Sequence, residues 1–179
     1  MRRVKLQLLF LALALFNALH RVLAFRFIRR ILYQIAGFRI HRSASLHDVR
    51  FFSFGKLSIG ADSNVNRGCY LDNRRGISIG DRVVIAQDTQ IYTLGHDINS
   101  LEFSTTGAGV RIEDYAVLFS NVLVMPGVAI GRGAVVLPGS VVVRDVEAMS
   151  IVGGNPAVRK GSRHEVHRNR VLHHYWCAP

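Results

Sequence analysis

The stretch IEDYAVLFSNVLVMPGVAIGRGAVVLPGSVVV, residues 112–143, repeats one large aliphatic residue at every sixth position. A small or β-branched residue follows four positions after each of them. The aliphatic series is Ile112, Leu118, Val124, Ile130, Val136 and Val142, and the second series is Ala116, Val122, Val128, Ala134, Ser140 and Val146. A helix repeats about every 3.6 residues and a strand every two, so neither keeps one aliphatic at each sixth place. Short strands separated by turns do, which predicts a three-sided parallel β-helix.

The same spacing extends toward the N-terminus with one slip and one interruption. An earlier series slips by two between Ile77 and Ile79, and residues 97–109 interrupt the count before Ile112. The earlier series is Ile59, Val65, Leu71, Ile77, Ile79, Ile85 and Ile91, and a weaker first coil is indicated by Ile40, Leu46 and Phe52. So many consecutive matches argue against a β-sandwich with accidental spacing. An insertion can only leave a coil outward, so we expect one external loop at about residues 97–110.

The repeat resembles that of a known enzyme family. Ile or Val followed by Gly, with a small residue at the fifth place, is similar to the hexapeptide-repeat acyltransferases. The segment VLVMPGVAIGRGAVVLPGSVVVRDV, followed by SIVGGNPA, is close to the C-terminal signature of that family, and the likeness covers about residues 55–160. The resemblance implies an all-β, left-handed parallel β-helix, a homotrimer, and acetyl-CoA as co-substrate.

His96 is the candidate catalytic residue. It lies at the base of the expected loop, and histidine is the side chain best suited to accept a proton near neutral pH. The sequence GHD in this place resembles the sugar O-acetyltransferases, such as the galactoside and maltose enzymes, which implies that His96 is the general base. The same resemblance implies that Asn66 lies next to the acceptor, although a turn residue is the alternative. Asp72 and Asn73 are candidates for binding sugar hydroxyls, and Asp97 for orienting His96 or binding the acceptor.

The resemblance also implies a coenzyme A site in the groove between subunits of the trimer. Matching the C-terminal signature gives these cofactor-binding candidates: Ser120, Pro138, Val143 and Arg144 along the groove, and Arg159 and Lys160 near phosphate. Many relatives have an aromatic residue and a glycine where this chain has Val117 and Phe119. Packing of the pantetheine arm is therefore expected to differ.

The chain has a formal charge of +11, and its cationic residues gather at the two ends. We expect a basic, apolar helical segment at residues 1–37, the β-helix at 38–156, and a basic tail at 157–179. A basic amphipathic helix rich in Leu and Phe is typical of a membrane-surface helix, and packing on the core or on a neighbouring subunit is the alternative. Two distant cysteines, Cys69 and Cys177, do not suggest a disulfide framework and favour a cytoplasmic location.

Other function classes find less support in the sequence. A carbonic anhydrase of this repeat type needs three histidine ligands. Within the repeats the chain offers only His96, with His41 and His47 far upstream in sequence, so no metal is expected. No nucleic-acid-binding motif is present, and a non-catalytic trimeric scaffold stays open. A likeness to colanic-acid and exopolysaccharide acetyltransferases points to surface polysaccharide synthesis. We therefore expect an O-acetyltransferase, peripheral on the cytoplasmic face of the membrane, acting on a free or lipid-linked sugar.

Overall fold

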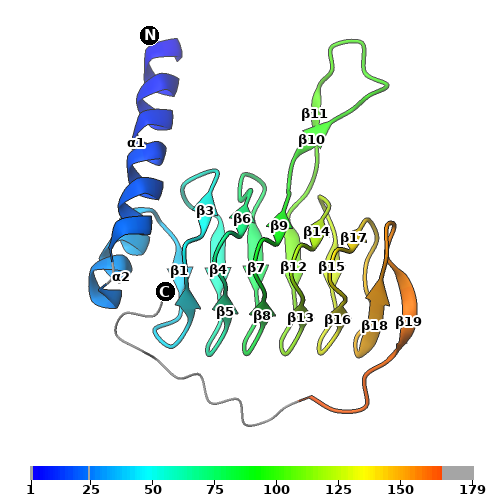
Figure 1. The fold of residues 1–179 in the computed structure, drawn as a ribbon. Helices are drawn as coiled ribbons and strands as arrows, with labels where there is room; N and C mark the ends of the chain where they lie inside the picture. Colours follow the sequence, from blue (N-terminus) through cyan, green and yellow to red (C-terminus); the bar gives the residue numbers. More distant parts are fainter. Residues whose placement is uncertain (1, 24, 167–179) are drawn as a thin grey trace.

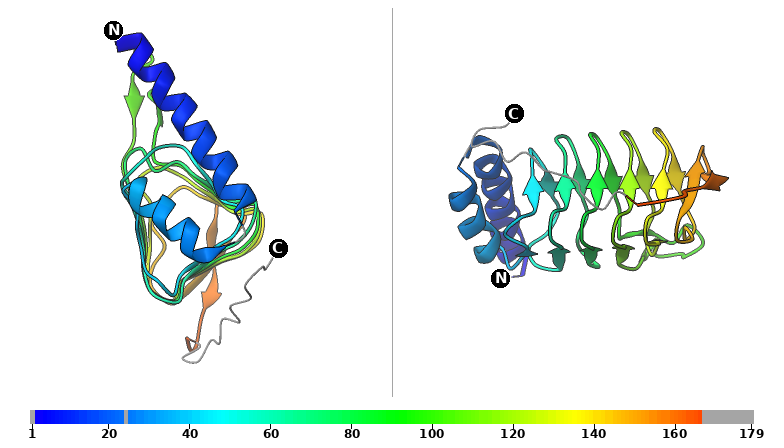
Figure 2. Two further views of the ribbon diagram at one scale, coloured as in Figure 1. Left: turned by 90° about the vertical axis from the view of Figure 1, so that its left-hand side faces the viewer. Right: turned by 90° about the horizontal axis from the view of Figure 1, so that it is seen from below.

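Three parallel sheets form the walls of a triangular coil (Figures 1 and 2). The computed structural model describes residues 2–23 and 25–166. Sheet A contains β1 (Arg39–Ile40), β4 (Leu57–Ile59), β7 (Ile77–Ile79), β12 (Val110–Ile112) and β15 (Ala129–Ile130). Sheet B contains β2 (Ser45–Leu46), β5 (Asn64–Val65), β8 (Val84–Ile85), β13 (Val117–Leu118), β16 (Val135–Val136), β18 (Ser150–Gly153) and β19 (Val158–Ser162). Sheet C contains β3 (Arg50–Phe51), β6 (Tyr70–Leu71), β9 (Gln90–Ile91), β14 (Leu123–Val124) and β17 (Val141–Val142). We call the turns between these walls the AB, BC and CA corners.

The predicted aliphatic columns are the core of the coil. All aliphatic residues of the two series, from Ile59 to Val142, are at most 3% exposed. They stack in register from coil to coil, as in the pairs Ile59 with Ile79 and Leu118 with Val136. Burying each such side chain contributes roughly 1.5–3 kcal/mol, so the column is the main source of stability. The prediction of a parallel β-helix is confirmed.

The first coil exists, but its last inward residue is one position earlier than the sixfold count indicates. Phe51 is 1% exposed and pairs in register with Leu71, whereas Phe52 is only half-buried. The step from Leu46 to the next core residue is therefore five residues. The slip between Ile77 and Ile79 has a simple reason: both are inward residues of β7, with Ser78 pointing out between them.

Helices α1 (Arg2–Val22) and α2 (Arg26–Ile35) close the N-terminal end of the coil (Figure 2). Phe16 of α1 packs against Phe51, with ring centroids 5.8 Å apart. The Asn17 side chain donates to the Phe51 carbonyl oxygen and accepts from its N–H, both at 2.9 Å, which satisfies the open edge of sheet C. His20 is fully buried with Nε2 2.8 Å from the Tyr33 hydroxyl, and burial together with the charge of Arg29 lowers its pKa to about 4. The C-terminal half of α1 therefore belongs to the core.

The N-terminal half of α1 projects beyond the coil (Figure 1). Val4, Leu8 and Leu11 are each more than half exposed. Over Arg3–Val22 the helix is long and apolar enough to cross a membrane, and little of it is buried. Such a helix at an N-terminus is weak evidence of a span, but it leaves a large apolar surface without a partner among the described residues.

The last strand of the described residues is β19. It pairs antiparallel with β18, so sheet B continues to Ser162, and the domain boundary expected at residue 156 stays a prediction. An antiparallel strand on the last coil pairs its open edge, which explains why residues 158–162 are ordered into the sheet. Residues 167–179, with Cys177 and most of the expected basic tail, lie outside the described residues.

The interruption of the sixfold count is a β-hairpin. Its strands β10 (Gly95–His96) and β11 (Thr105–Thr106) pair antiparallel and leave the coil at the CA corner. The hairpin and the N-terminal half of α1 project in the same direction, as two views show (Figures 1 and 2). Ile98, Leu101 and Phe103 are highly exposed on its outer part. The external loop is thus confirmed, and His96 is already part of its stem.

Candidate active site

His96 is held by the far side of its own hairpin. Its Nδ1 lies 2.8 Å from the carbonyl oxygen of Phe103, and the two rings stack with centroids 4.4 Å apart and planes 6° from parallel. A carbonyl oxygen can only accept, so the proton of the neutral imidazole must be on Nδ1. Nε2 then carries the lone pair, and no described residue bonds to it. This is the tautomer that a general base needs, with its basic atom free.

Asp97 forms hydrogen bonds within the hairpin, and binding of the acceptor by this residue stays a prediction. Its carboxylate accepts from the N–H of Asn99 at 2.9 Å, and its own N–H donates to the Ser104 carbonyl oxygen at 2.8 Å. The Phe103 carbonyl orients the histidine in its place. Phe103 has a φ of +49°, which the turn between the two hairpin strands imposes. The sequence does not predict this backbone conformation. The only sequence feature that could have indicated a role for Phe103 is that it is an aromatic residue in the otherwise polar stretch EFSTT.

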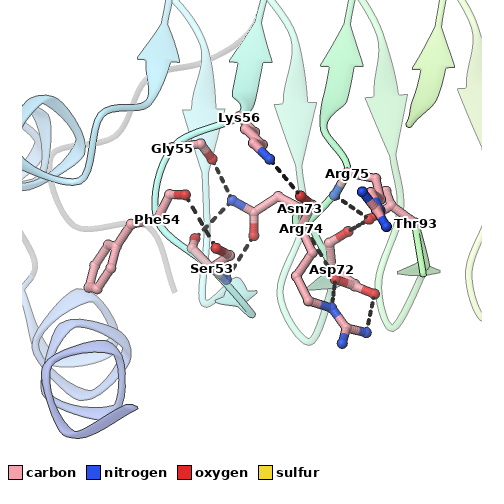
Figure 3. A network of polar contacts seen from close by, with 9 residues as sticks. All are labelled: Ser53, Phe54, Gly55, Lys56, Asp72, Asn73, Arg74, Arg75 and Thr93. Carbon is pink, nitrogen blue, oxygen red and sulfur yellow. Dashed lines mark hydrogen bonds and ion pairs between the residues drawn. The ribbon is translucent and has the colours of Figure 1, made fainter. Parts of the chain in front are cut away.

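Asn73 ties two turns of the CA corner together (Figure 3). Its Oδ1 accepts from the N–H of Ser53 at 2.9 Å, and its Nδ2 donates to the carbonyl oxygens of Ser53 and Gly55 at 2.8 and 2.7 Å. The side chain is fully buried, and both amide hydrogens are used. The structure therefore gives Asn73 a role in fixing the corner, and binding of a sugar hydroxyl by this residue stays a prediction.

Asp72 is engaged in the same corner (Figure 3). Both carboxylate oxygens accept from the guanidinium of Arg74 at 2.8 Å. Burial alone would raise the pKa of Asp72, but the hydrogen bonds from Arg74 outweigh it and the pKa lies below its ordinary value. Thr93 completes the network, because its hydroxyl donates to the Asp72 carbonyl oxygen at 2.6 Å and accepts from the N–H of Arg75 at 3.0 Å. The predicted acceptor contact of Asp72 likewise has no direct support here.

The other predicted residues fall on two different corners. Asn66, Ser120 and Pro138 lie in the turns of the BC corner that follow β5, β13 and β16. Val143 and Arg144 follow β17 at the CA corner, where the hairpin of His96 also begins. Sheet C separates the two groups within one chain. Within one chain, Asn66 and His96 thus lie at different corners of the coil, and the acceptor contact of Asn66 stays a prediction.

Arg159 and Lys160 lie on β19, at the far end of sheet B. The guanidinium of Arg159 pairs with Glu147 at 2.9 Å and donates to the Ser162 hydroxyl, while Lys160 is exposed. Both cations are on the surface of the last coil, and contact with a cofactor phosphate stays a prediction for each.

The four histidines before the expected tail lie in different places, and His20 is buried beside Tyr33 at the N-terminal end of the coil. His41 follows β1 at the AB corner, His47 follows β2 at the BC corner, and His96 is beyond the CA corner. Within residues 2–23 and 25–166, no three His, Cys, Asp or Glu side chains are grouped so as to hold a metal ion. Cys69 points into the coil, where burial raises the pKa of its thiol to about 12. The one described cysteine is thus not a reactive thiol.

Comparison by sequence finds acetyltransferases. The chain is 31% identical over 131 residues to a putative colanic acid biosynthesis acetyltransferase of Escherichia coli, covering 73% of this chain and 72% of that protein. It also matches serine acetyltransferase 2 of Arabidopsis thaliana at 32% identity over 101 residues. The chain spans about a third of that protein and of serine acetyltransferase 4, and about half of two putative yeast acetyltransferases. No protein-family model matches it.

Comparison by structure finds the same fold in solved acetyltransferases. A hexapeptide-repeat acetyltransferase of Vibrio cholerae, solved with acetyl coenzyme A, superposes with a TM-score of 0.80 at 27% identity, covering 90% of each chain. A maltose O-acetyltransferase of Clostridium difficile shares the fold, with a TM-score of 0.75 at 24% identity over 86% of each chain. Together with the hexapeptide spacing and the bacterial relative matched over most of its length, these likenesses show that the chain belongs to the hexapeptide-repeat acetyltransferases.

Proposed function

We propose that this protein transfers acetyl from acetyl-CoA to a sugar hydroxyl, with His96 as general base. The observation that carries the proposal is the fixed tautomer of His96, whose Nδ1 proton is donated to the Phe103 carbonyl and whose Nε2 is free. The acceptor oxygen attacks the thioester carbonyl carbon while Nε2 takes the hydroxyl proton, because a free alkoxide would be far too basic to form first. The C–S bond then breaks, and the coenzyme A thiolate takes the proton from the imidazolium.

The site is completed by a neighbouring subunit in a homotrimer. Asn66, Ser120 and Pro138 lie at one edge of sheet C, and His96, Val143 and Arg144 at the other. A ring in which the BC corner of one chain meets the CA corner of the next brings both groups to one groove. The outward residues of sheet C also favour contact between copies, since most are aromatic or aliphatic: Arg50, Tyr70, Gln90, Leu123 and Val141.

Coenzyme A occupies the same groove in this proposal. Ser120 and Pro138 of one chain and Val143 and Arg144 of the next would flank the pantetheine arm, with Arg159 and Lys160 toward the phosphates. Phe119 is 43% exposed at the place where many relatives have a glycine. It narrows the groove beside the thioester, so acyl chains longer than acetyl are expected to bind less well.

We place the enzyme on the cytoplasmic face of a membrane, in the synthesis of a surface polysaccharide. The exposed leucines of α1 provide the apolar contact, and cationic residues follow at its coil end, where they can meet anionic lipid. Acetyl-CoA is supplied from the cytoplasm. The likeness to a colanic acid biosynthesis acetyltransferase supports the choice of a polysaccharide unit as acceptor.

Replacing His96 tests the mechanism. His96→Ala should lower kcat by at least about a hundredfold, because the proton of the hydroxyl then has no acceptor. The measurement is release of coenzyme A in the presence of a panel of sugars, with mass detection of the acetylated product. His41→Ala removes an exposed histidine at the AB corner and serves as the control. Full activity of the His96 variant would end this mechanism.

Removing the projecting part of α1 tests the membrane contact. Deleting residues 2–12 takes away exposed side chains but spares Phe16, Asn17 and His20, which pack on the first coil. The shortened protein should leave the membrane fraction in vesicle flotation and keep its melting temperature. A longer deletion, of residues 1–36, should unfold it, since the rings of Phe16, His20 and Tyr33 that pack on Phe51 are lost with it. Continued flotation of the short deletion would contradict membrane attachment through α1.

A further inference from the structure

A cationic hollow opens on sheet A beside the foot of the hairpin. Its volume is about 360 Å³, and its lining includes the four cations Arg39, Lys56, Arg75 and Arg111 but no acidic side chain. None of the sequence motifs predicts it, because its residues come from three coils and the hairpin return. A hollow lined by charge of one sign concentrates ligands of the opposite sign. We refer to it below as the cationic hollow.

The register of sheet A builds the floor of the cationic hollow. Arg39 pairs with Ser58, Ser58 with Ser78, and Ser78 with Arg111 along four adjacent strands. These residues point outward, because their neighbours on β4, β7 and β12 are buried. Two short hydroxyl side chains thus lie between two arginines whose backbones are three strand spacings, or about 14 Å, apart. Guanidinium groups that lean inward from both sides can reach one anion between them.

Two glycines keep the upper wall of the cationic hollow open. Gly76 and Gly109 face each other across the CA corner, where the N–H of Val110 donates to the Gly76 carbonyl oxygen at 3.0 Å. A Cβ on Gly109 would lie 2.9 Å from the carbonyl oxygens of both Arg75 and Gly76. The close approach of the hairpin return to this corner therefore needs glycine, and it leaves backbone instead of side chain above the serines.

The four cations are largely available to a ligand. All four side chains are exposed, and among the described residues those of Arg39 and Arg75 have no ion-pair or hydrogen-bond partner. Lys56 Nζ donates to the Arg74 carbonyl oxygen at 3.2 Å, and Arg111 Nε lies 3.5 Å from the exposed Glu113. The network of Asn73 and Thr93 fixes the turns that carry Lys56 and Arg75 (Figure 3). Guanidinium groups with hydroxyls between them suit a phosphate, which accepts several charged hydrogen bonds at once.

The cationic hollow is one short segment away from the proposed base. Thr105 pairs with His96 across the hairpin, and Gly109 at the rim follows it by four residues, which span at most about 14 Å. A phosphate in the hollow and a hydroxyl at His96 could thus belong to one acceptor molecule of one or two sugar units. Helix α2 contacts β1, the strand that carries Arg39. The N-terminal helical segment, which we propose to contact the membrane, therefore borders sheet A and the cationic hollow.

We propose that the cationic hollow binds the phosphate of the acceptor, so that the substrate is a sugar carried on a phosphate or diphosphate. The inference rests on the proposed acetyl transfer and names the class of its acceptor. The carrier is a nucleoside or a membrane lipid, since both present the same diphosphate chemistry to the four cations.

Binding of inorganic pyrophosphate tests the cationic hollow without any acetyl transfer. Titration calorimetry on the full chain should detect binding, and Arg39→Gln with Arg111→Gln should weaken it by at least about tenfold, because two charged hydrogen-bond donors are removed. Arg42→Gln with Arg132→Gln removes the same charge from exposed positions at the AB corner and should leave the affinity unchanged. Equal weakening in both double variants, or no binding by the wild type, would overturn the proposal.

Kinetics with three forms of one sugar then identify the carrier. The sugar is offered as a nucleoside diphosphate ester, as a polyprenyl diphosphate ester in vesicles, and as a methyl glycoside. The Arg39/Arg111 double variant should raise KM for the diphosphate forms by at least about tenfold and leave kcat and the KM for acetyl-CoA unchanged. The diphosphate form with the higher kcat/KM identifies the carrier as a nucleoside or a lipid.

The two proposals fail separately. If no acceptor is acetylated but the Arg39/Arg111 variant still binds pyrophosphate more weakly than the wild type, the proposal of acetyl transfer is wrong and the proposal of an anion site stands. If the methyl glycoside is acetylated as well as the diphosphate forms and the variant changes nothing, the cationic hollow is not part of the acceptor site while the acetyl transfer stands.

Discussion

Two corners of this coil repeat one turn, whereas the third changes from coil to coil. From the second coil to β16, the AB corner uses four residues between strands, at 60–63, 80–83, 113–116 and 131–134, and the third of them has positive φ. From the second coil on, the BC corner does the same at 66–69, 86–89, 119–122 and 137–140, whereas its first turn, 47–49, has three residues. The CA corner spans 52–56, 72–76, 92–109 and 125–128, and it carries the hairpin of His96 and the rim of the cationic hollow.

The regular corners and the CA corner differ in the groups that form hydrogen bonds with the backbone of their turns. At the regular corners each turn donates to the turn of the preceding coil, as Asp88 N–H does to Arg67 and Asn121 N–H to Gln87. The turns of the CA corner differ from those of the regular corners in length, and side chains supply much of the bonding between them. Asn73 and Thr93 supply the missing donors and acceptors. The coil can therefore hold a functional insertion where side chains, and not the repeat, fix the turn.

Replacing Asn73 should have the largest effect on stability. Asn73→Ala removes three hydrogen bonds that join two turns and leaves buried backbone groups without partners. Losing them should lower the free energy of unfolding by about 3 kcal/mol. Gln87→Ala, at the exposed surface of the BC corner, is the control and should change little. Urea unfolding at one fixed protein concentration measures both, and equal values would mean that the corners are not held differently.

Adding one methyl group at Gly109 should affect catalysis more than folding. The new Cβ meets two carbonyl oxygens of the CA corner and displaces the return of the hairpin. A shift of this size at a base costs about tenfold or more in kcat/KM. Gly161→Ala is the matched control, because a Cβ there has no heavy atom within 4 Å. If both variants keep full activity, the foot of the hairpin does not position His96.

The sequence alone predicts the regular part of the coil well. Every sixth residue from Ile112 to Val142 is buried. In a stacked coil the residue at each sixth position points inward, so the spacing of the aliphatic residues predicts which side chains are buried. The count fails by one residue at Phe51, where the first coil packs on Phe16 of α1 as well as on the coil below. The BC turn before Phe51, residues 47–49, is one residue shorter than the later ones, and the sixfold spacing does not predict a shorter turn.

The site is only partly predictable, for a physical reason. The position of His96 before an insertion marks it, but its partner is a backbone carbonyl placed by the positive φ of Phe103. Arg39 and Arg111 both lie on the floor of the cationic hollow, but the coils between them differ in length. No fixed interval therefore relates the strands that carry them, and the repeat does not predict that the two residues lie together. Asn73 and Asp72 are predicted to bind sugar hydroxyls. In the structure their side-chain polar atoms form hydrogen bonds within the CA corner itself, which the sixfold spacing does not predict.

The smallest effect should come from a regular corner. Arg82 has a φ of +54° in the AB turn, one coil before Tyr115, and Gly133 occupies the same place further on. Arg82→Gly relieves about 1 kcal/mol of left-handed strain but removes exposed interactions with Tyr115 and Asp62, which are worth about as much. The free energy of unfolding should therefore change by less than about 1 kcal/mol, with kcat/KM unaltered. A loss of activity would mean that the AB corner also supports the site, because Gly133 already shows that the turn itself accepts glycine.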